Sequence, residues 1–197
     1  MCIRDSHQAE RACLGGSWHV HLTVTRLGKP QGPVCGKPHT TPFAGASLLA
    51  MTSWRATTPQ PVQDDFDALV TLASDWAQHL LKKQGEFFPF GVNMSDEGQD
   101  GFFDAFDPEL GEHPESMQVL DLLYEGAAGA KECWRAIAIV ADVMFEGADA
   151  VRIVAEHRDA ATALVVTMPY TRKGMLRKTV TYGQTTTHSG EKLAWTD

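Results

Sequence analysis

The sequence predicts an α+β protein with a single antiparallel sheet that two helices cover on one face. Two segments place apolar residues at the three- and four-residue spacing of an amphipathic helix, and several shorter segments alternate apolar and polar residues as strands do. The connections between consecutive strands are short, and short connections join antiparallel neighbours. The expected order of elements is therefore helix, two strands, helix and four strands.

The first helix is expected at about residues 61–84. Pro61 suits the first turn, where the missing N–H has no helical partner to lose, and Gly85 is typical of the position just after a helix. Lys82 and Lys83 favour the negative end of the helix dipole. The apolar residues share one stripe, which we expect to face the sheet: Phe66, Leu69, Val70, Ala73, Trp76, Ala77, Leu80 and Leu81.

A β-hairpin and a second helix are expected next. Two aromatic-rich runs, 86–94 and 102–106, flank the polar, glycine-containing segment 95–101, a pattern typical of a hairpin. The second helix opens at His113-Pro114-Glu115 and continues to about Trp134.

The rest of the chain predicts a meander of strands followed by a polar tail. In the second strand of this meander, apolar residues and His157 alternate with a charged face that includes Glu156. We therefore expect His157 to point inward and Glu156 outward. The four strands are expected at residues 136–145, 151–158, 162–170 and about 175–185.

Residues 1–50 differ in composition from residues 51–197. The first segment has five basic and two acidic residues, whereas the second has 12 basic and 23 acidic residues. Residues 1–6 (MCIRDS) resemble a translated transposon end of the kind used to fragment DNA for sequencing, and residues 28–46 are rich in Gly and Pro. Apart from a possible short strand at Trp18–Val24, we expect residues 1–50 to be a non-native or irregular leader, with a genuine N-terminal extension as the alternative, and residues 51–197 to form a single α+β domain.

The motifs that carry common chemistries are absent from the sequence. It contains no phosphate-binding glycine loop, nucleophile elbow or C-x-x-C pair, and the acidic segment around Asp100 does not fit a calcium-binding loop. We therefore assign no catalytic residue, no metal ligand and no cofactor, and we leave enzymatic activity open while favouring a non-catalytic role. No apolar run is long enough to span a membrane, and the single cysteine after residue 50, Cys133, fits a reducing compartment such as the cytoplasm.

Charge gives the leading hypothesis for function. Residues 86–125 contain 11 acidic residues and no Lys or Arg. A surface of one sign attracts basic partners and repels nucleic acid. We expect a cytoplasmic, non-catalytic protein-interaction module, similar in role to an immunity or adaptor protein, that binds the basic surface of a protein partner. The candidate contact residues are Glu97, Asp100, Asp104, Asp107, Phe87 and Phe103.

The alternative hypothesis is a small-molecule-binding regulator, or a small enzyme, that acts on an anionic metabolite. An inward-facing imidazole, a tyrosine and a short basic loop would supply a proton carrier and positive charge. The candidate ligand-binding residues are His157, Tyr170, Arg172 and Lys173.

Three short patterns resemble a family of small uncharacterised bacterial α+β proteins. They are Gly85-Glu86-Phe87-Phe88-Pro89-Phe90-Gly91, then Glu156-His157-Arg158, and then Pro169-Tyr170. The resemblance covers about residues 61–185 and implies a bacterial origin and the fold, but no activity. The predicted order of elements is also similar, at the level of fold alone, to profilin-like and roadblock-like sandwiches.

Overall fold

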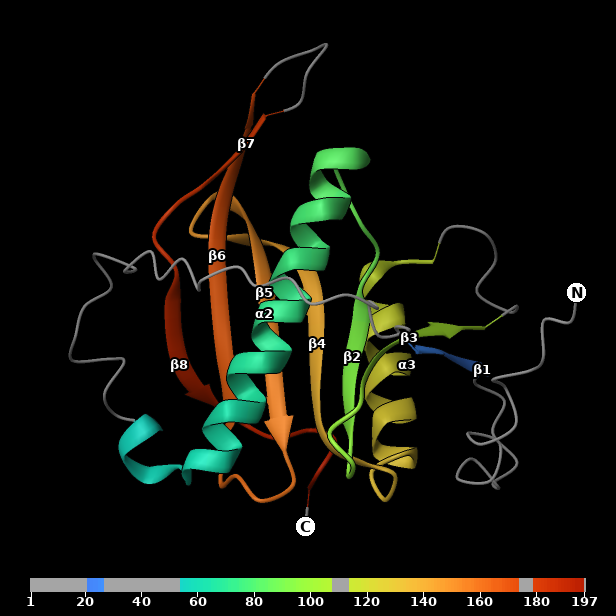
Figure 1. The fold of residues 1–197 in the computed structure, drawn as a ribbon. Helices are drawn as coiled ribbons and strands as arrows, with labels where there is room; N and C mark the ends of the chain where they lie inside the picture. The colour runs from blue at the N-terminus through green and yellow to red at the C-terminus, as the bar shows by residue number, and fades with distance from the viewer. Residues whose placement is uncertain (1–20, 27–53, 108–113, 174–178, 197) are drawn as a thin grey trace, which may run out of the picture.

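The computed structural model describes residues 21–26, 54–107, 114–173 and 179–196 (Figure 1). In these residues the chain forms a single sheet of eight strands with two long helices. The helices are α2 (Gln60–Lys83) and α3 (Ser116–Gly129). The strands are β1 (His21–Arg26), β2 (Phe90–Ser95), β3 (Asp100–Phe106), β4 (Trp134–Phe145), β5 (Ala148–His157), β6 (Ala163–Lys173), β7 (Thr179–Tyr182) and β8 (Thr186–Gly190).

The sheet is antiparallel throughout, which confirms the predicted α+β class with a single antiparallel sheet. The strand order is β1-β3-β2-β4-β5-β6-β7, and β8 pairs with β6 as well. β6 carries both partners because it is long: Ala163–Thr167 pairs with β8, and Tyr170–Lys173 pairs with β7. β8 was not predicted, because its residues, TTHSG, are polar or small and show no apolar alternation.

The two helices lie on opposite faces of the sheet, so the prediction that both cover one face is wrong. In β4, Ala136, Ala138 and Val140 pack in the same cluster as α2, whereas Ile137 and Ile139 pack in the cluster that contains α3. Figure 1 shows α2 crossing the sheet over β4 and β5, with α3 close to β2 and β3. A strand that is apolar at successive positions is buried on both faces. The uninterrupted apolar run in β4 therefore indicated a covering layer on each face of the sheet.

Helix α2 begins and ends within one residue of its predicted limits. Its buried residues recur every three or four positions and face β5, β4 and β2. The helix ends at Lys83, and Gly85 follows with a φ of +90°, a conformation that favours glycine. The buried residues are Val62, Gln63, Phe66, Leu69, Ala73, Ala77 and Leu81.

The predicted hairpin is present as β2 and β3, and its packing depends on Gly91. Phe103 lies opposite Gly91 in the register, and a Cβ on Gly91 would collide with the Phe103 ring. The ring also contacts Trp134, at 4.9 Å between centroids. The absence of a side chain at Gly91 therefore creates the space in which Phe103 is buried on the α3 side.

The ends of the chain fit the predictions less closely. The last predicted strand, 175–185, appears as β7 over Thr179–Tyr182, while residues 174–178 lie outside the described part. Residues His21–Arg26 form β1, which pairs with β3. The predicted run Trp18–Val24 overlaps it, and the other residues of the predicted leader lie outside the described part. No described helix is both long enough and apolar enough to cross a membrane.

Candidate functional site

A row of aromatic rings lies where α2 meets the β2–β3 hairpin. The ring of Phe87 contacts that of Phe90 at 5.7 Å between centroids, and Phe90 contacts Phe102 at 6.1 Å. Trp76 of α2 lies 5.2 Å from Phe102 and stacks on His79 at the same distance with an interplanar angle of 15°. The row thus runs from the buried ring of Phe90 to exposed rings on the helix.

Trp76 is the large aromatic residue of this row that remains open to solvent, with 40% of its surface exposed. The buried stripe of α2 passes through Ala73 and Ala77, so Trp76 lies one residue to the side of it. From that flank its ring reaches over Phe102 of β3 rather than into the core. The sequence analysis assigned Trp76 to the buried stripe, and this assignment is wrong because the stripe is narrower than predicted.

Two exposed carboxylates lie on β3 beside this row. Successive strand residues point to opposite faces, so Asp100 and Asp104 lie on the same face as Phe102. Among the described residues, no ion pair involves Asp100 or Asp104. We call Trp76, His79, Phe102, Asp100 and Asp104 the aromatic–acidic surface.

The other predicted contact residues are placed differently. Glu97 is exposed in the hairpin turn and accepts a hydrogen bond from Ser95 Oγ at 2.8 Å. Asp107 is half-buried after the end of β3, and Phe87 is half-buried against the core. Phe103 is 1% exposed, so its prediction as a contact residue is wrong. Strand alternation turns it to the face opposite Phe102, where it packs under α3.

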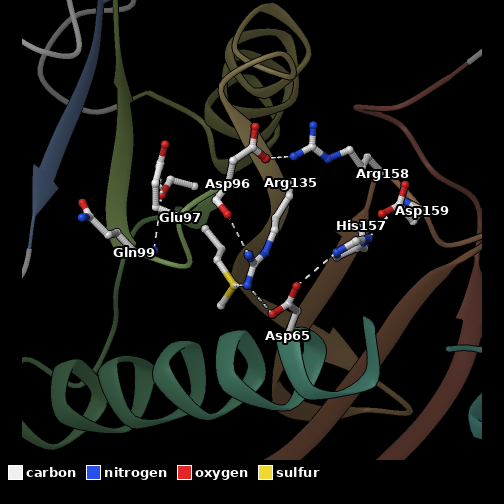
Figure 2. Close-up of polar contacts among 10 residues, drawn as sticks. Asp65, Asp96, Glu97, Gln99, Arg135, His157, Arg158 and Asp159 are labelled. Carbon is white, nitrogen blue, oxygen red and sulfur yellow. Dashed lines mark hydrogen bonds and ion pairs between the residues drawn. The ribbon is translucent and has the colours of Figure 1, made fainter. Parts of the chain in front are cut away.

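Beneath the hairpin turn, Asp65 of α2 joins two strands (Figure 2). Its Oδ1 accepts a hydrogen bond from Arg135 Nη2 of β4 at 2.7 Å, and its Oδ2 lies 3.2 Å from His157 Nε2 of β5. Phe66, the next residue in α2, packs edge-on against the imidazole. A carboxylate that bridges a guanidinium and an imidazole in this way fixes the first turns of α2 to the sheet.

His157 is buried, and both of its ring nitrogens are engaged. The backbone N–H of Asp159 donates to Nδ1 at 3.0 Å, so Nδ1 carries no proton and Nε2–H donates to Asp65. Burial lowers the pKa of His157 below its ordinary 6.5, and the hydrogen bond to Asp65 offsets part of that effect. The neutral imidazole thus serves as a structural hydrogen-bonding group between two segments.

The same cluster holds the hairpin turn. Arg135 Nη1 donates to the carbonyl oxygen of Asp96 at 3.0 Å, and Arg158 pairs with the Asp96 carboxylate. Figure 2 shows how Arg135 lies between Asp65 below and Asp96 above. We call Asp65, Asp96, Arg135, His157 and Arg158 the hairpin-base network. It connects α2, β4, β5 and the β2–β3 turn, and so it fixes the position of β3.

Tyr170 and Arg172 belong to a second polar cluster. The Tyr170 hydroxyl donates to both carboxylate oxygens of Asp142, at 2.8 Å each. Arg172 donates to the Gly85 carbonyl and pairs with Asp149 at 3.0 Å. Burial is the main cause that raises the pKa of both Asp142 and Tyr170 above their ordinary values.

The four predicted ligand-binding residues do not form one site. His157 pairs with Ala136 at one end of β5, whereas Ala150, near the other end, pairs with Pro169 beside Tyr170. The two positions are seven residues apart along β5, or about 23 Å. Lys173 is exposed and lies three residues after Tyr170 in β6, also away from His157. The hypothesis of an anionic-metabolite site required these four side chains to lie close together, and they do not.

Sequence reasoning also missed a buried carboxylate on the α3 side. Glu156 is fully buried, contrary to its predicted place on a charged outer face. Its two carboxylate oxygens accept hydrogen bonds from the backbone N–H groups of Leu193 and Ala194, at 2.9 and 3.0 Å. Desolvation first, and the charge of Glu156 second, raise the pKa of nearby Tyr124 to about 12. Glu156 thus anchors the C-terminal tail to the sheet.

Two further expectations concern metals and cysteine. Within the described part of the chain, no group of three or more His, Cys, Asp or Glu side chains is arranged to hold a metal ion. Cys133 is disulfide-bonded. The expectation of a reducing compartment rested on Cys133 as the single cysteine after residue 50, and its disulfide bond removes that support.

Comparison with known proteins gives no match. No family model, no curated protein and no solved structure matches this chain.

Proposed function

We propose that this protein is a non-catalytic interaction module that binds a basic protein partner through the aromatic–acidic surface. The observation that carries the proposal is the half-exposed indole of Trp76, which lies over Phe102 on the face that also bears Asp100 and Asp104. Tryptophan is enriched among the residues that dominate binding energy at protein interfaces. Exposed aromatic groups with a polar rim are typical of such contacts.

The charge of the molecule supports a basic partner. The chain has a formal net charge of −8, and residues 86–125 contain 11 acidic residues without a single Lys or Arg. Such a surface accelerates encounter with a cationic protein and disfavours a phosphate backbone. An immunity-like or adaptor-like role, in which this surface covers a basic region of its partner, fits these properties.

The hairpin-base network supports the proposal because it makes the surface rigid. Arg135 binds the turn that precedes β3, and Asp65 binds Arg135 to the helix that carries Trp76. The two elements of the surface are therefore held together before a partner arrives. A preorganised surface loses less conformational entropy on binding than a mobile one.

The polar clusters favour a structural role over catalysis. Both ring nitrogens of His157 have partners within the chain, and the Tyr170 hydroxyl is bound to Asp142. A general acid or base must reach a proton of its substrate, which these groups do not do while they hold the fold.

Charge reversal tests the proposal. We expect the double variant D100K/D104K to lose the proteins that the wild-type chain captures from a cell lysate, as quantified by mass spectrometry. The matched control is D121K/E125K, which changes two exposed acidic residues of α3 by the same amount. If D100K/D104K captures the same proteins as the wild type, the aromatic–acidic surface is not the contact site.

A further inference from the structure

We propose that the partner docks as a basic amphipathic helix that lies alongside α2 and over β3. This inference rests on the proposed function, because it specifies what binds to the aromatic–acidic surface. Three features support it: the α2-side face of β3, which no helix among the described residues packs on closely, the usual spacing of helices on a sheet, and the positions of Asp100 and Asp104.

Among the described residues, no helix packs closely on the α2-side face of β3, whereas α3 packs on the other face. On the α3 side, Phe103 is buried between Trp134 and the helix. On the α2 side, Phe102 is only half-buried, and Asp100 and Asp104 are exposed. Helix α2 packs against β5, β4 and β2, and Trp76 reaches over β3 from its flank.

The position over β3 lies about one helix spacing from α2. Helices that pack side by side are about 8–10 Å apart, which corresponds to about two strand spacings of 4.8 Å. The next helix after α2 would therefore lie over β3, with Trp76 between the two helices. A partner that binds as an added strand would need an open backbone edge of the sheet. The position over β3 presents side chains, as grooves that bind helices do.

Charge complementarity specifies the chemistry of the partner helix. Asp100 and Asp104 are four residues apart along β3, or about 13 Å. A helix rises by about that distance over eight to nine residues. A partner helix with Lys or Arg residues about eight positions apart would place one cation near each carboxylate. An apolar stripe beside these residues would contact Trp76 and Phe102.

Two synthetic peptides test the binding mode. The first is an 18-residue Leu/Lys peptide with an apolar stripe at helical spacing. The second has the same composition, but its order is scrambled so that no stripe forms. Binding to the full-length protein is measured by isothermal titration calorimetry, and amide and indole shifts are followed by NMR. We expect the helical peptide to bind at least tenfold more tightly than the scrambled one and to shift the Trp76 indole signal.

Variants of the protein then locate the contact. We expect W76A, and separately D100N/D104N, to weaken binding of the helical peptide about tenfold, since interface tryptophans and paired charges contribute at this level. D121N/E125Q, which removes the same charge from α3, should leave the affinity within twofold. Because Trp76 is half-exposed, circular dichroism should show an unchanged fold in W76A.

The outcomes separate the two proposals. Equal binding of both peptides, with the same loss in D100N/D104N, would overturn the helical mode and leave the contact surface in place. Peptide affinity that is unchanged in W76A and in D100N/D104N would overturn both the contact surface and the helical mode. Nuclear Overhauser contacts between the Trp76 indole and residues 27–53 would show that the chain's own segment occupies the position, and would also overturn the docked helix.

Discussion

The hairpin-base network and the aromatic–acidic surface both include residues of α2 and of the β2–β3 hairpin, but their carboxylates have opposite roles. Asp65 is enclosed and has a partner at each oxygen, Arg135 at 2.7 Å and His157 at 3.2 Å. Asp100 and Asp104 are exposed, and no ion pair among the described residues involves them. A carboxylate that is already paired stabilises the fold, whereas an exposed one remains available to a partner.

The largest expected effect on stability is that of F103A, compared with that of W76A. F103A removes a fully buried ring and should lower the free energy of unfolding by about 4 kcal/mol, as truncation of core aromatic residues does. W76A should lower it by less, about 2 kcal/mol, because 40% of the surface of Trp76 is already exposed to water. Urea denaturation measures both. Equal losses would contradict the assignment of one side to the core and the other to a binding surface.

Removal of Asp65 should give the next largest effect. D65A leaves Arg135 and His157 without their shared acceptor, and we expect a loss of about 3 kcal/mol in the free energy of unfolding. R135A should not add fully to this loss, because both variants break the same contact. The double-variant cycle, followed by denaturation, measures this coupling, and full additivity would show that the two residues act independently.

The pH dependence of stability should report on His157. Its folded pKa lies below 6.5, so the unfolded chain takes up a proton at a higher pH than the folded chain. The contribution of the neutral imidazole is therefore present above about pH 6.5 and decreases as the pH falls toward the folded pKa. We expect the stability difference between pH 7.5 and pH 5.5 to be smaller in H157Q than in the wild type. H79Q, which removes an exposed histidine outside the hairpin-base network, is the control.

The smallest effect on stability is expected at the proposed contact residues. D100N and D104N should each change the free energy of unfolding by less than about 0.5 kcal/mol, as exposed substitutions do. The same substitutions should weaken partner binding, and this effect should decrease at high salt because exposed charges are screened. A stability loss above about 1 kcal/mol in a denaturant titration would place these carboxylates among the groups that hold the fold.

Residue spacing was enough to predict α2 and the β2–β3 hairpin. The stripe from Phe66 to Leu81 fixed α2 to within a residue, and the aromatic runs about a polar turn located the hairpin. Side-chain direction was harder to predict. Phe102 and Phe103 are equally apolar, and only the register with Gly91 shows which one is buried beneath α3.

Long-range contacts account for the remaining errors. Nothing in the local pattern of β5 shows that Glu156 meets the backbone of Leu193, because that contact depends on the course of the C-terminal tail. His157 and Tyr170 both follow strand alternation, yet the antiparallel register places them near opposite ends of the adjacent strands β5 and β6. Pairing registers are properties of the assembled sheet, so a single strand does not contain them.

Hydroxyl-radical footprinting of the complex with a captured partner tests the central claim most directly. Trp76, Met117 and Met144 are all well exposed, at 40%, 65% and 70%, and all three side chains react readily with such radicals. The account predicts that the partner protects Trp76 from oxidation and leaves Met117 of α3 and Met144 of β4 unchanged. Protection of Met117 or Met144, with Trp76 oxidised as in the free protein, would contradict it.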